Sequence, residues 1–440
     1  MSAWTDRVQG FGLYITALSV FLAPAGVSIG LGLIWLGFFM SLATGRRRLP
    51  SSSGVWLALA FVAYVLADGV FRQASGVAAA GRLESVAEWV QLGVFVPVAY
   101  ALRGDQHRLL QLLRLALIGL VLGVLWRLDW SLLFSDSARF LKSRPGFGFP
   151  AIVFALFAGV ALVGLLVLRE RWWTAGASRT AGWPVLVWLV VTTFVAQAFV
   201  LTLSRGAWVA LVGTAVTAFW MNLRGLGAQA ATPTRRSPLL LAAGVLLTGL
   251  LVFNSGPMVD RLVEERAAVG AMLSGQLDYS SESSLSLRWH AQLFGLQQWL
   301  ERPMFGWGAG ASRALMKTSG NPALLDQGVL LKHLHNTYLE ILVQLGLVGL
   351  LLWIGIFVSL LMSVASAWRN GALSPDLARF LILSIVYLAI WDLFDFHALH
   401  QGWRGHWAML AGAALSVGLF AKVARSGLDD AREEGACASP

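Results

Sequence analysis

Long runs of apolar residues, separated by short polar segments, dominate the chain. Most of these runs approach the roughly 20 residues that a helix needs to cross the apolar core of a bilayer. They lack the strict alternation of half-buried strands, and their length favours membrane-spanning helices. Twelve segments of this kind fall at about 11–24, 26–43, 55–71, 86–102, 109–126, 148–168, 183–203, 206–220, 237–254, 338–362, 380–394 and 405–421.

The predicted spans divide the chain into four parts. Residues 1–254 hold nine spans with short loops, and residues 338–422 hold the last three. Residues 255–337 form the only loop long enough to fold, and residues 423–440 are predicted to be a disordered cytoplasmic tail. A polar tract at 225–236 is predicted to be a flexible linker. The sequence therefore predicts an all-α, polytopic membrane protein with about 12 transmembrane helices and one large loop that contains helices.

Composition and charge support this class. The chain of 440 residues is 57% hydrophobic and 13% charged, whereas soluble domains carry about 25% charged residues. The net charge of +10 fits loops that face anionic lipid, and we expect no nucleic-acid partner. Short loops on the side of the N-terminus hold 17 Lys and Arg residues, and those on the other side hold eight. Both termini are therefore predicted to be cytoplasmic. The single cysteine, Cys437, excludes disulfides within the chain.

Two arginines interrupt the apolar pattern on the predicted outer side. Arg205 lies between two apolar stretches with almost no loop, and an arginine within a span costs about 2.5–3.5 kcal/mol at its centre. Gly206 allows close backbone approach, so this position favours a bound anion, although a snorkelling side chain at a tight turn is the alternative. Arg144 lies in a Pro/Gly-rich approach to the sixth span, where short-loop arginines should be depleted. It is either a second anion ligand or part of an ordinary positive loop.

The long loop contains one clear helical pattern, over residues 285–300. Arg288 lies near its start, and an amphipathic helix on the membrane surface is the simplest interpretation. A glycine-rich run follows at 303–310, but no strand precedes it and no Lys-Ser/Thr follows it, so we expect a plain turn rather than a phosphate loop. The apolar residues of the helical pattern are Leu285, Trp289, Leu293, Leu296 and Leu300.

A polar patch leads into the tenth predicted span. Asn336 is a plausible N-cap, and it shares a helix face with Glu340. His333 and His335 precede it, but a His-x-His pair without a third clear ligand is a weak metal signal, so we expect no metal. A neutral imidazole at the positive end of a helix is suited to accept a proton. The alternative is a pair of interfacial histidines without a chemical role.

Two acidic residues, Asp392 and Asp395, lie near the outer end of the eleventh predicted span. Either could pair with the outer arginines, or it could orient a histidine. The sequence does not decide between the two residues.

These motifs together resemble the O-antigen ligase and polymerase superfamily of bacterial envelopes. The matching features are the 202–206 segment, the Ser-rich segment that ends at Arg288, the 303–310 run, and His335-Asn336-x-x-x-Glu340 followed by Gly346. The resemblance implies a lipid-dependent glycosyltransferase of the mostly helical GT-C type. Such an enzyme transfers a glycan from undecaprenyl pyrophosphate on the periplasmic face of the bacterial inner membrane. Ligases deliver it to the lipid A–core oligosaccharide of lipopolysaccharide, and polymerases extend another lipid-linked glycan; the length and the Arg/His set look more like a ligase.

The resemblance also implies roles for the residues. His335, paired with Asn336 in the family motif, is expected to act as the general base of an inverting transfer. Because a lipid pyrophosphate is a stable leaving anion, we expect arginines to hold it and no metal or cofactor to be needed. A transporter of lipid-linked glycans is the alternative, but it should show repeated halves, which are not seen; a non-catalytic scaffold would not need His335. The expected substrate contacts are Arg144, Arg205, Arg288, Asn336, Glu340 and Asp392.

Overall fold

The computed structural model describes residues 2–44, 50–74, 82–173, 182–224, 237–263, 266, 269–270, 274, 284–326 and 328–437. Nearly all regular structure in them is helical. The elements before the long loop are α1 (Ser2–Ser19), α2 (Pro24–Ala43), α3 (Ser53–Ala74), α4 (Arg82–Val90), η1 (Gln91–Val94), α5 (Phe95–Leu102), α6 (Gln106–Arg127), α7 (Trp130–Ser135), α8 (Ser137–Lys142), α9 (Ala151–Val167), α10 (Arg169–Trp173), α11 (Gly182–Leu201), α12 (Arg205–Leu223) and α13 (Ser237–Phe253). Those that follow are α14 (Ser255–Val263), α16 (Ser284–Glu301), α17 (Ala311–Ser319), η3 (Pro322–Leu324), β1 (Leu325–Asp326), β2 (Val329–Leu330), α18 (Thr337–Arg369), α19 (Pro375–Trp391) and α20 (Gln401–Cys437).

All twelve predicted apolar segments coincide with helical residues, and the fourth is divided by the 3₁₀ turn η1. Within the described residues, seven candidate spans are long and apolar enough to cross a membrane, so the chain is a polytopic membrane protein. The count of twelve spans stays a prediction. The seven spans are Pro24–Ala43, Ser53–Arg72, Leu83–Leu102, Gln106–Arg127, Trp183–Leu201, Arg205–Leu223 and Thr337–Arg369.

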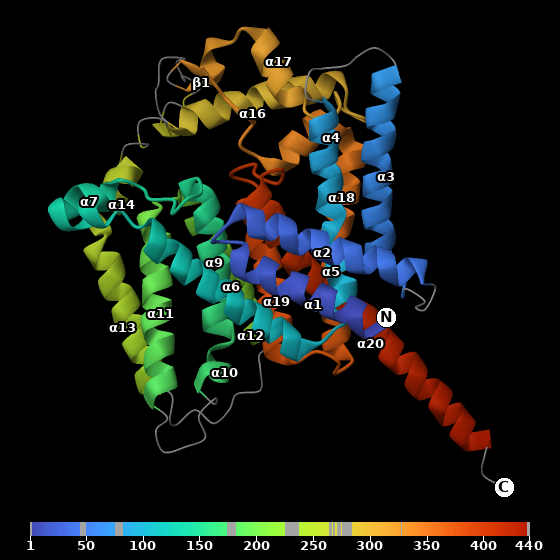
Figure 1. Cartoon of the computed structure of the whole chain (residues 1–440). Coiled ribbons are helices and arrows are strands. Elements are labelled where there is room, and N and C mark those ends of the chain that lie inside the picture. The colour runs from blue at the N-terminus through green and yellow to red at the C-terminus, as the bar shows by residue number, and fades with distance from the viewer. Residues whose placement is uncertain are drawn as a thin grey trace.

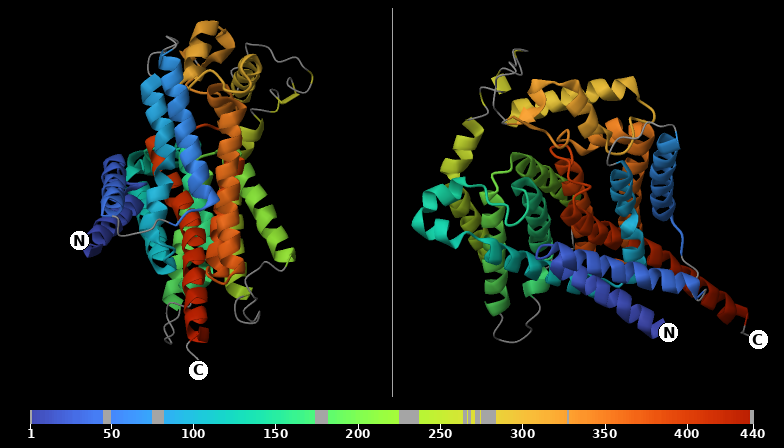
Figure 2. Two further views of the ribbon diagram at one scale, coloured as in Figure 1. Left: turned by 90° about the vertical axis from the view of Figure 1, so that its right-hand side faces the viewer. Right: turned by 45° about the horizontal axis from the view of Figure 1, so that its top comes forward.

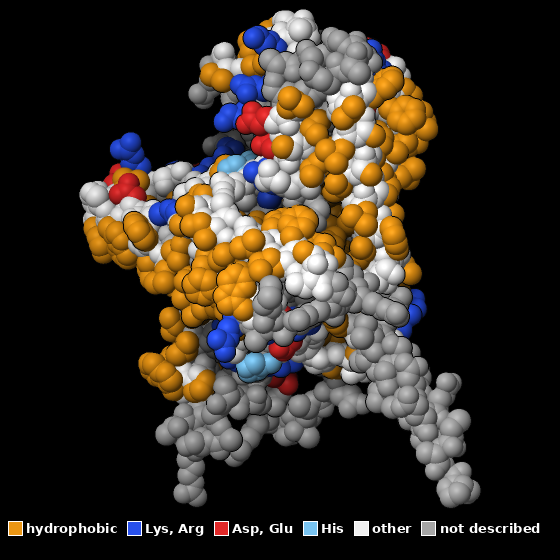
Figure 3. Space-filling view, turned by 45° about the vertical axis from the view of Figure 1, so that its right-hand side comes forward, with side chains coloured by type: hydrophobic (Ala, Val, Ile, Leu, Met, Phe, Trp, Pro, Cys, Tyr) orange, Lys and Arg blue, Asp and Glu red, His pale blue; other side chains and the backbone are white. Residues whose placement is uncertain are grey.

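The surface of the bundle is apolar where lipid would lie. Large side chains such as Trp126 (82% exposed) and Phe134 (81% exposed) point outward. Figure 3 shows apolar side chains gathered over much of the face that it draws, with charged residues mainly toward the ends. An apolar surface of this extent is typical of contact with a membrane.

Two predictions concern segments at the margins of the described structure. The expected linker at 225–236 lies outside the described residues. The tail from residue 423 is expected to be disordered, which stays a prediction; α20 is assigned as far as Cys437.

The long loop folds over one end of α18. Figures 1 and 2 place α16 and α17 across the end of the bundle, beyond the start of α18 and level with the end of α3. The helix predicted at 285–300 is confirmed as α16. A small hydrophobic core joins the loop to the first turns of α18; it contains Ala291, Phe294, Met316, Leu324, Leu331, Leu334 and Val343.

The buried face of α16 differs from the one its leucines indicate. Leu293, Leu296 and Leu300 are exposed, whereas the small residues Ala291 and Gly295 face the bundle. A Cβ at position 295 would lie 2.7 Å from the Leu334 side chain, so a larger residue would force the Leu334 and Leu339 side chains to shift. The buried face of α16 therefore combines Phe294 with small residues that allow close packing, and these three leucines lie on the other faces.

A break in α18 receives the glycine-rich 303–310 segment. Gly346 has φ 66° and ψ −170°, which interrupts the helical hydrogen bonds around it. The backbone N–H groups of Trp307 and Gly308 donate to the carbonyls of Val343 and Gln344, each at 2.8 Å. In return, the N–H of Leu347 donates to the Pro303 carbonyl at 2.9 Å. The segment expected to be a plain turn is thus a strap that restores the hydrogen bonds lost at the break.

Arg72 of α3 fastens this strap to the bundle. Its guanidinium donates to the carbonyls of Phe305 and Gly306, at 3.0 and 2.9 Å. The Nε atom pairs with Asp68 at 2.7 Å, which balances the buried charge. The loop is therefore held by α3 as well as by α18.

We expect Gly346→Ala to destabilise the protein. Its φ of 66° is strained for any other residue, at a cost of roughly 1–3 kcal/mol, and the new Cβ would lie 2.3 Å from the Met304 carbonyl oxygen. The thermal midpoint in detergent should fall. Gly32→Ala in α2 is the matched control, because a Cβ there meets nothing within 4 Å. Equal midpoints for the two variants would contradict this account of the break.

Candidate active site

His335 occupies a strained backbone position directly before α18. Its φ is 55°, in the left-handed region. Asn336 follows as the N-cap, and its side-chain oxygen accepts the N–H of Leu339 at 3.0 Å, which confirms the predicted cap. The carbonyl of His335 faces the Gln292 amide of α16 at 3.5 Å. The helix start therefore fixes the backbone on which the imidazole is carried.

Glu340, in the first turn of α18, is buried, with 1% exposure, and it binds the loop that precedes this helix. Its carboxylate accepts the N–H of Leu334 at 2.9 Å and the side-chain amide of Gln344 at 2.7 Å. Gln344 in turn accepts from Trp89 at 2.9 Å and from the N–H of Gly310 at 2.8 Å. We predicted Glu340 as a substrate contact, but each hydrogen bond described for it goes to protein. These contacts position the loop that carries His335.

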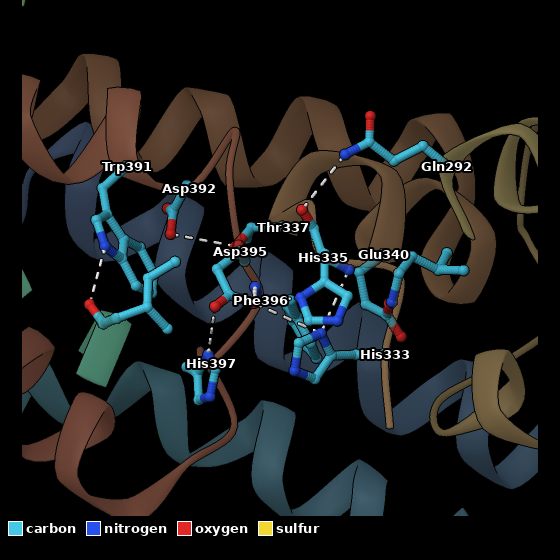
Figure 4. Close-up of polar contacts among 12 residues, drawn as sticks. Gln292, His333, His335, Thr337, Glu340, Trp391, Asp392, Asp395, Phe396 and His397 are labelled. Atoms are coloured by element: carbon cyan, nitrogen blue, oxygen red, sulfur yellow. Dashed lines mark hydrogen bonds and ion pairs between the residues drawn. The ribbon is translucent and has the colours of Figure 1, made fainter. Parts of the chain in front are cut away.

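Asp395 is the centre of the site (Figure 4). It lies in the loop after α19, with 1% exposure, and its Oδ1 atom lies 3.0 Å from His335 Nδ1. His333 and His397 also turn their Nδ1 atoms toward this carboxylate, each at 3.6 Å. The sequence could not choose between Asp392 and Asp395 as the partner of the histidine. The structure selects Asp395.

Asp392 instead joins the start of α18 to the end of α19. Its carbonyl accepts the N–H of Thr337 at 2.8 Å, and its Oδ1 lies 3.1 Å from the Thr337 hydroxyl. That hydroxyl also lies 2.8 Å from the carbonyl of Asp395. Asp392 is fully buried, so these described contacts tie the two helices together rather than face a substrate cleft.

Burial and mutual contact set the charge states around Asp395. Burial lowers the pKa of His333 to about 3, and burial also lowers the pKa of His397. Burial alone would raise the pKa of Asp395, but His397, His335 and His333 around it hold the value below its ordinary range. At neutral pH the site therefore holds a carboxylate beside neutral His333 and His397 imidazoles.

The three predicted arginines lie on segments that meet beside these histidines. The Arg144 Nε donates to the carbonyl of Thr202 at 3.3 Å, and the Arg205 guanidinium donates to the Ser284 hydroxyl at 3.0 Å. Ser284 begins α16, which carries Arg288 one turn later, and the charge of Arg288 contributes to the lowered pKa values of His333 and His397. Segments more than 100 residues apart in sequence thus converge.

Close packing joins the Arg205 turn to the loop of Asp395. A Cβ at Gly206 would lie 2.6 Å from the Phe394 side chain, so the glycine lets the start of α12 reach this loop. Sequence analysis singled out Gly206 for close backbone approach, and the structure shows what approaches it.

Backbone strain is concentrated here. Among the described residues, five non-glycine positions have positive φ: Arg103, Arg144, Phe147, Leu203 and His335. Arg103 caps α5; of the other four, Arg144 and His335 are candidate site residues, and Phe147 and Leu203 lie within three residues of Arg144 and Arg205. Each such conformation costs roughly 1–3 kcal/mol, and strain of this kind collects at functional sites.

Comparison with known families gives a match to the segment that contains much of this arrangement. Residues 190–354 match the O-antigen ligase family. The chain carries an O-antigen ligase family domain. This match confirms the resemblance found in the sequence motifs over that segment. The comparison with curated proteins found no match.

The O-antigen ligase domain contains only part of the site. Arg205, Arg288 and His335 lie within residues 190–354, whereas Arg144 and Asp395 lie outside them. Both nevertheless contact residues of the matched segment, Arg144 at Thr202 and Asp395 at His335. The complete site therefore needs α9 and α19 with their adjoining loops.

Proposed function

We propose that the protein transfers O-antigen glycan from undecaprenyl pyrophosphate to the lipid A–core oligosaccharide on the periplasmic face of the inner membrane. The observation that carries this proposal is the His335–Asp395 pair, 3.0 Å apart at a helix start beside three converging arginines. A histidine oriented by a buried carboxylate is a recurrent general base. Family membership supports lipid-linked glycan as the substrate class.

The chemistry requires one proton transfer. Asp395 accepts a hydrogen bond from Nδ1–H of His335, which leaves Nε2 as the accepting nitrogen. The acceptor hydroxyl oxygen attacks the anomeric carbon opposite the leaving group, and its proton moves to Nε2. The bond from that carbon to the pyrophosphate oxygen breaks, and undecaprenyl pyrophosphate departs with the bond electrons. The anomeric configuration is inverted.

Arg144, Arg205 and Arg288 would hold the pyrophosphate. A guanidinium stays charged in a partly dry cleft and matches two phosphate oxygens at once. Since the leaving group is a stable anion, the reaction needs neither an acid at that oxygen nor a metal ion. In this proposal Asn336, Glu340 and Asp392 position the base and the helices, and the three arginines contact the donor.

A polymerase that extends a second lipid-linked glycan would use the same chemistry. The two functions differ only in the acceptor. Transfer from purified lipid-linked glycan should be measured with lipid A–core and, separately, with a second lipid-linked glycan. Product on lipid A–core alone supports the ligase, and product only on the lipid-linked acceptor would replace it with the polymerase.

We expect His335→Ala to abolish detectable transfer, because an unassisted hydroxyl is a weak nucleophile and a base contributes roughly 10²–10⁴-fold. Donor binding should persist, since the base acts on the acceptor. His333→Ala is the matched control and should keep substantial activity. Rates and donor affinity should be measured for both variants. A normal rate for His335→Ala would exclude this residue as the base.

We expect Arg205→Lys to fold but to lose most transfer. Lysine keeps the charge but lacks the planar pair of donors that binds two phosphate oxygens together. Arg114→Lys in α6 is the control, because this exposed arginine lies outside the proposed site. The same change at Arg144 and Arg288 then ranks the three side chains. Near-normal transfer by Arg205→Lys would argue against bidentate contact with the donor.

The proposed orientation can be tested with cysteine labelling. Ser274→Cys lies in the long loop and should react with a membrane-impermeant thiol reagent in intact cells whose outer membrane admits it. The parent chain is the control, because its one cysteine, Cys437, is expected in the cytoplasm and should react only after the inner membrane is lysed. The reverse pattern would place the long loop in the cytoplasm.

A further inference from the structure

Asp395 is contacted by two histidines that the proposed reaction does not use. His333 Nδ1 lies 3.6 Å from Oδ1 of Asp395, and His397 Nδ1 lies 3.6 Å from Oδ2. One ligand atom from each of the three residues lies within 4.8 Å of the others. In a tetrahedral zinc site with bonds of about 2.1 Å, neighbouring ligand atoms lie roughly 3.4 Å apart. The spacing of these three side chains is therefore close to that of zinc ligands.

His397 gives a second, independent reason to look for a ligand here. Its Nδ1 atom is buried and, among the described residues, has no hydrogen-bond partner. The 3.6 Å to Asp395 is too long for a hydrogen bond. Buried polar atoms are normally satisfied, so an unpartnered imidazole nitrogen facing a carboxylate requires an explanation. A cation between the two groups would satisfy both.

His333 completes the set from the other side. Its Nδ1 accepts only a long hydrogen bond, 3.3 Å, from the N–H of His335, so this nitrogen carries a lone pair that a cation can use. The His333 and His397 rings lie 5.1 Å apart in an edge-to-face arrangement. Sequence analysis dismissed a metal because His333 and His335 lacked a third ligand; the loop after α19 supplies Asp395 and His397.

We propose that His333, Asp395 and His397 form a binding site for a divalent transition-metal cation, with Zn²⁺ as the best match, and that the bound cation inhibits glycan transfer. Two imidazole nitrogens and one carboxylate suit zinc, whereas Mg²⁺ and Ca²⁺ prefer oxygen ligands. The inhibitory part rests on the proposed role of His335 as base; the binding part does not.

Inhibition follows from competition for one carboxylate. Asp395 Oδ1 lies 3.0 Å from His335 Nδ1 and 3.6 Å from His333 Nδ1. A cation bound to Asp395 withdraws its negative charge from His335. The imidazole then loses the partner that orients it and that would stabilise its protonated form after the transfer. A cation at this site therefore opposes catalysis, and chelation of trace metal should leave or raise the rate.

Arg288 sets an opposing charge. It acts on both His333 and His397, so it weakens cation binding at this site. We therefore expect zinc to bind more tightly to Arg288→Gln than to the unaltered protein.

Zinc binding is measured directly on the purified protein by competition with a chromophoric chelator. One Zn²⁺ per chain is expected, with at least about tenfold weaker binding for His333→Ala and for His397→Ala. His335→Ala is the matched control, and it should bind zinc as tightly as the parent or more tightly, because it releases Asp395. No saturable binding by the parent, or equal affinity for both ligand variants and the parent, would overturn the site.

Glycan transfer is then measured with added Zn²⁺. The parent should be inhibited reversibly, with the rate restored by a chelator, and His397→Ala should resist the same zinc concentration. Specific binding without any effect on transfer would overturn the inhibitory role. If the parent transfers no glycan under any condition, the proposed function fails, while the binding measurements still decide whether the zinc site exists.

Discussion

A single buried carboxylate, Asp395, is the constraint around which the site is arranged. A buried charge costs several kcal/mol unless it is paired and hydrogen-bonded. The chain meets this requirement with the N–H of Phe396 at 2.9 Å and His335 Nδ1 at 3.0 Å, while His333 and His397 lie 3.6 Å away and cover the carboxylate. The loop before α18 and the loop after α19 must therefore lie together. The contacts of Thr337 with Asp392 and Asp395 hold them in that place.

The other end of the histidine loop is held by α18 itself. The break at Gly346 accepts the 303–310 strap, and Gln344 links the strap at Gly310 to Glu340. Glu340 then binds the backbone next to the histidine, at Leu334. A base is useful only if its position is fixed to within about half an ångström. The glycine-rich 303–310 segment and Glu340 looked unrelated in the sequence. Both help to fix the position of the loop that carries His335.

Sequence reasoning predicted most of the helices and the key polar residues. The helix at 285–300, the Asn336 cap and the family were all confirmed, because periodicity, capping and short motifs are local signals. It could not separate Asp395 from Asp392, since their partners come from a loop about 60 residues earlier. It also missed the docked strap and the outward leucines of α16, because Gly295 and Gly346 act through close approach between distant segments.

The fold separates the positive charges of the arginines from the negative charge of Asp395. A pyrophosphate donor needs the positive arginines, yet a base needs a carboxylate that would repel that donor. In this chain the Asp395 carboxylate is 1% exposed and covered by imidazoles, whereas 19% of the His335 side chain is exposed. In the proposed mechanism, the histidine can therefore reach an acceptor while it shields the donor from the negative charge of Asp395. Burial of Asp395 is what would allow the proposed anion site and the proposed general base to be neighbours.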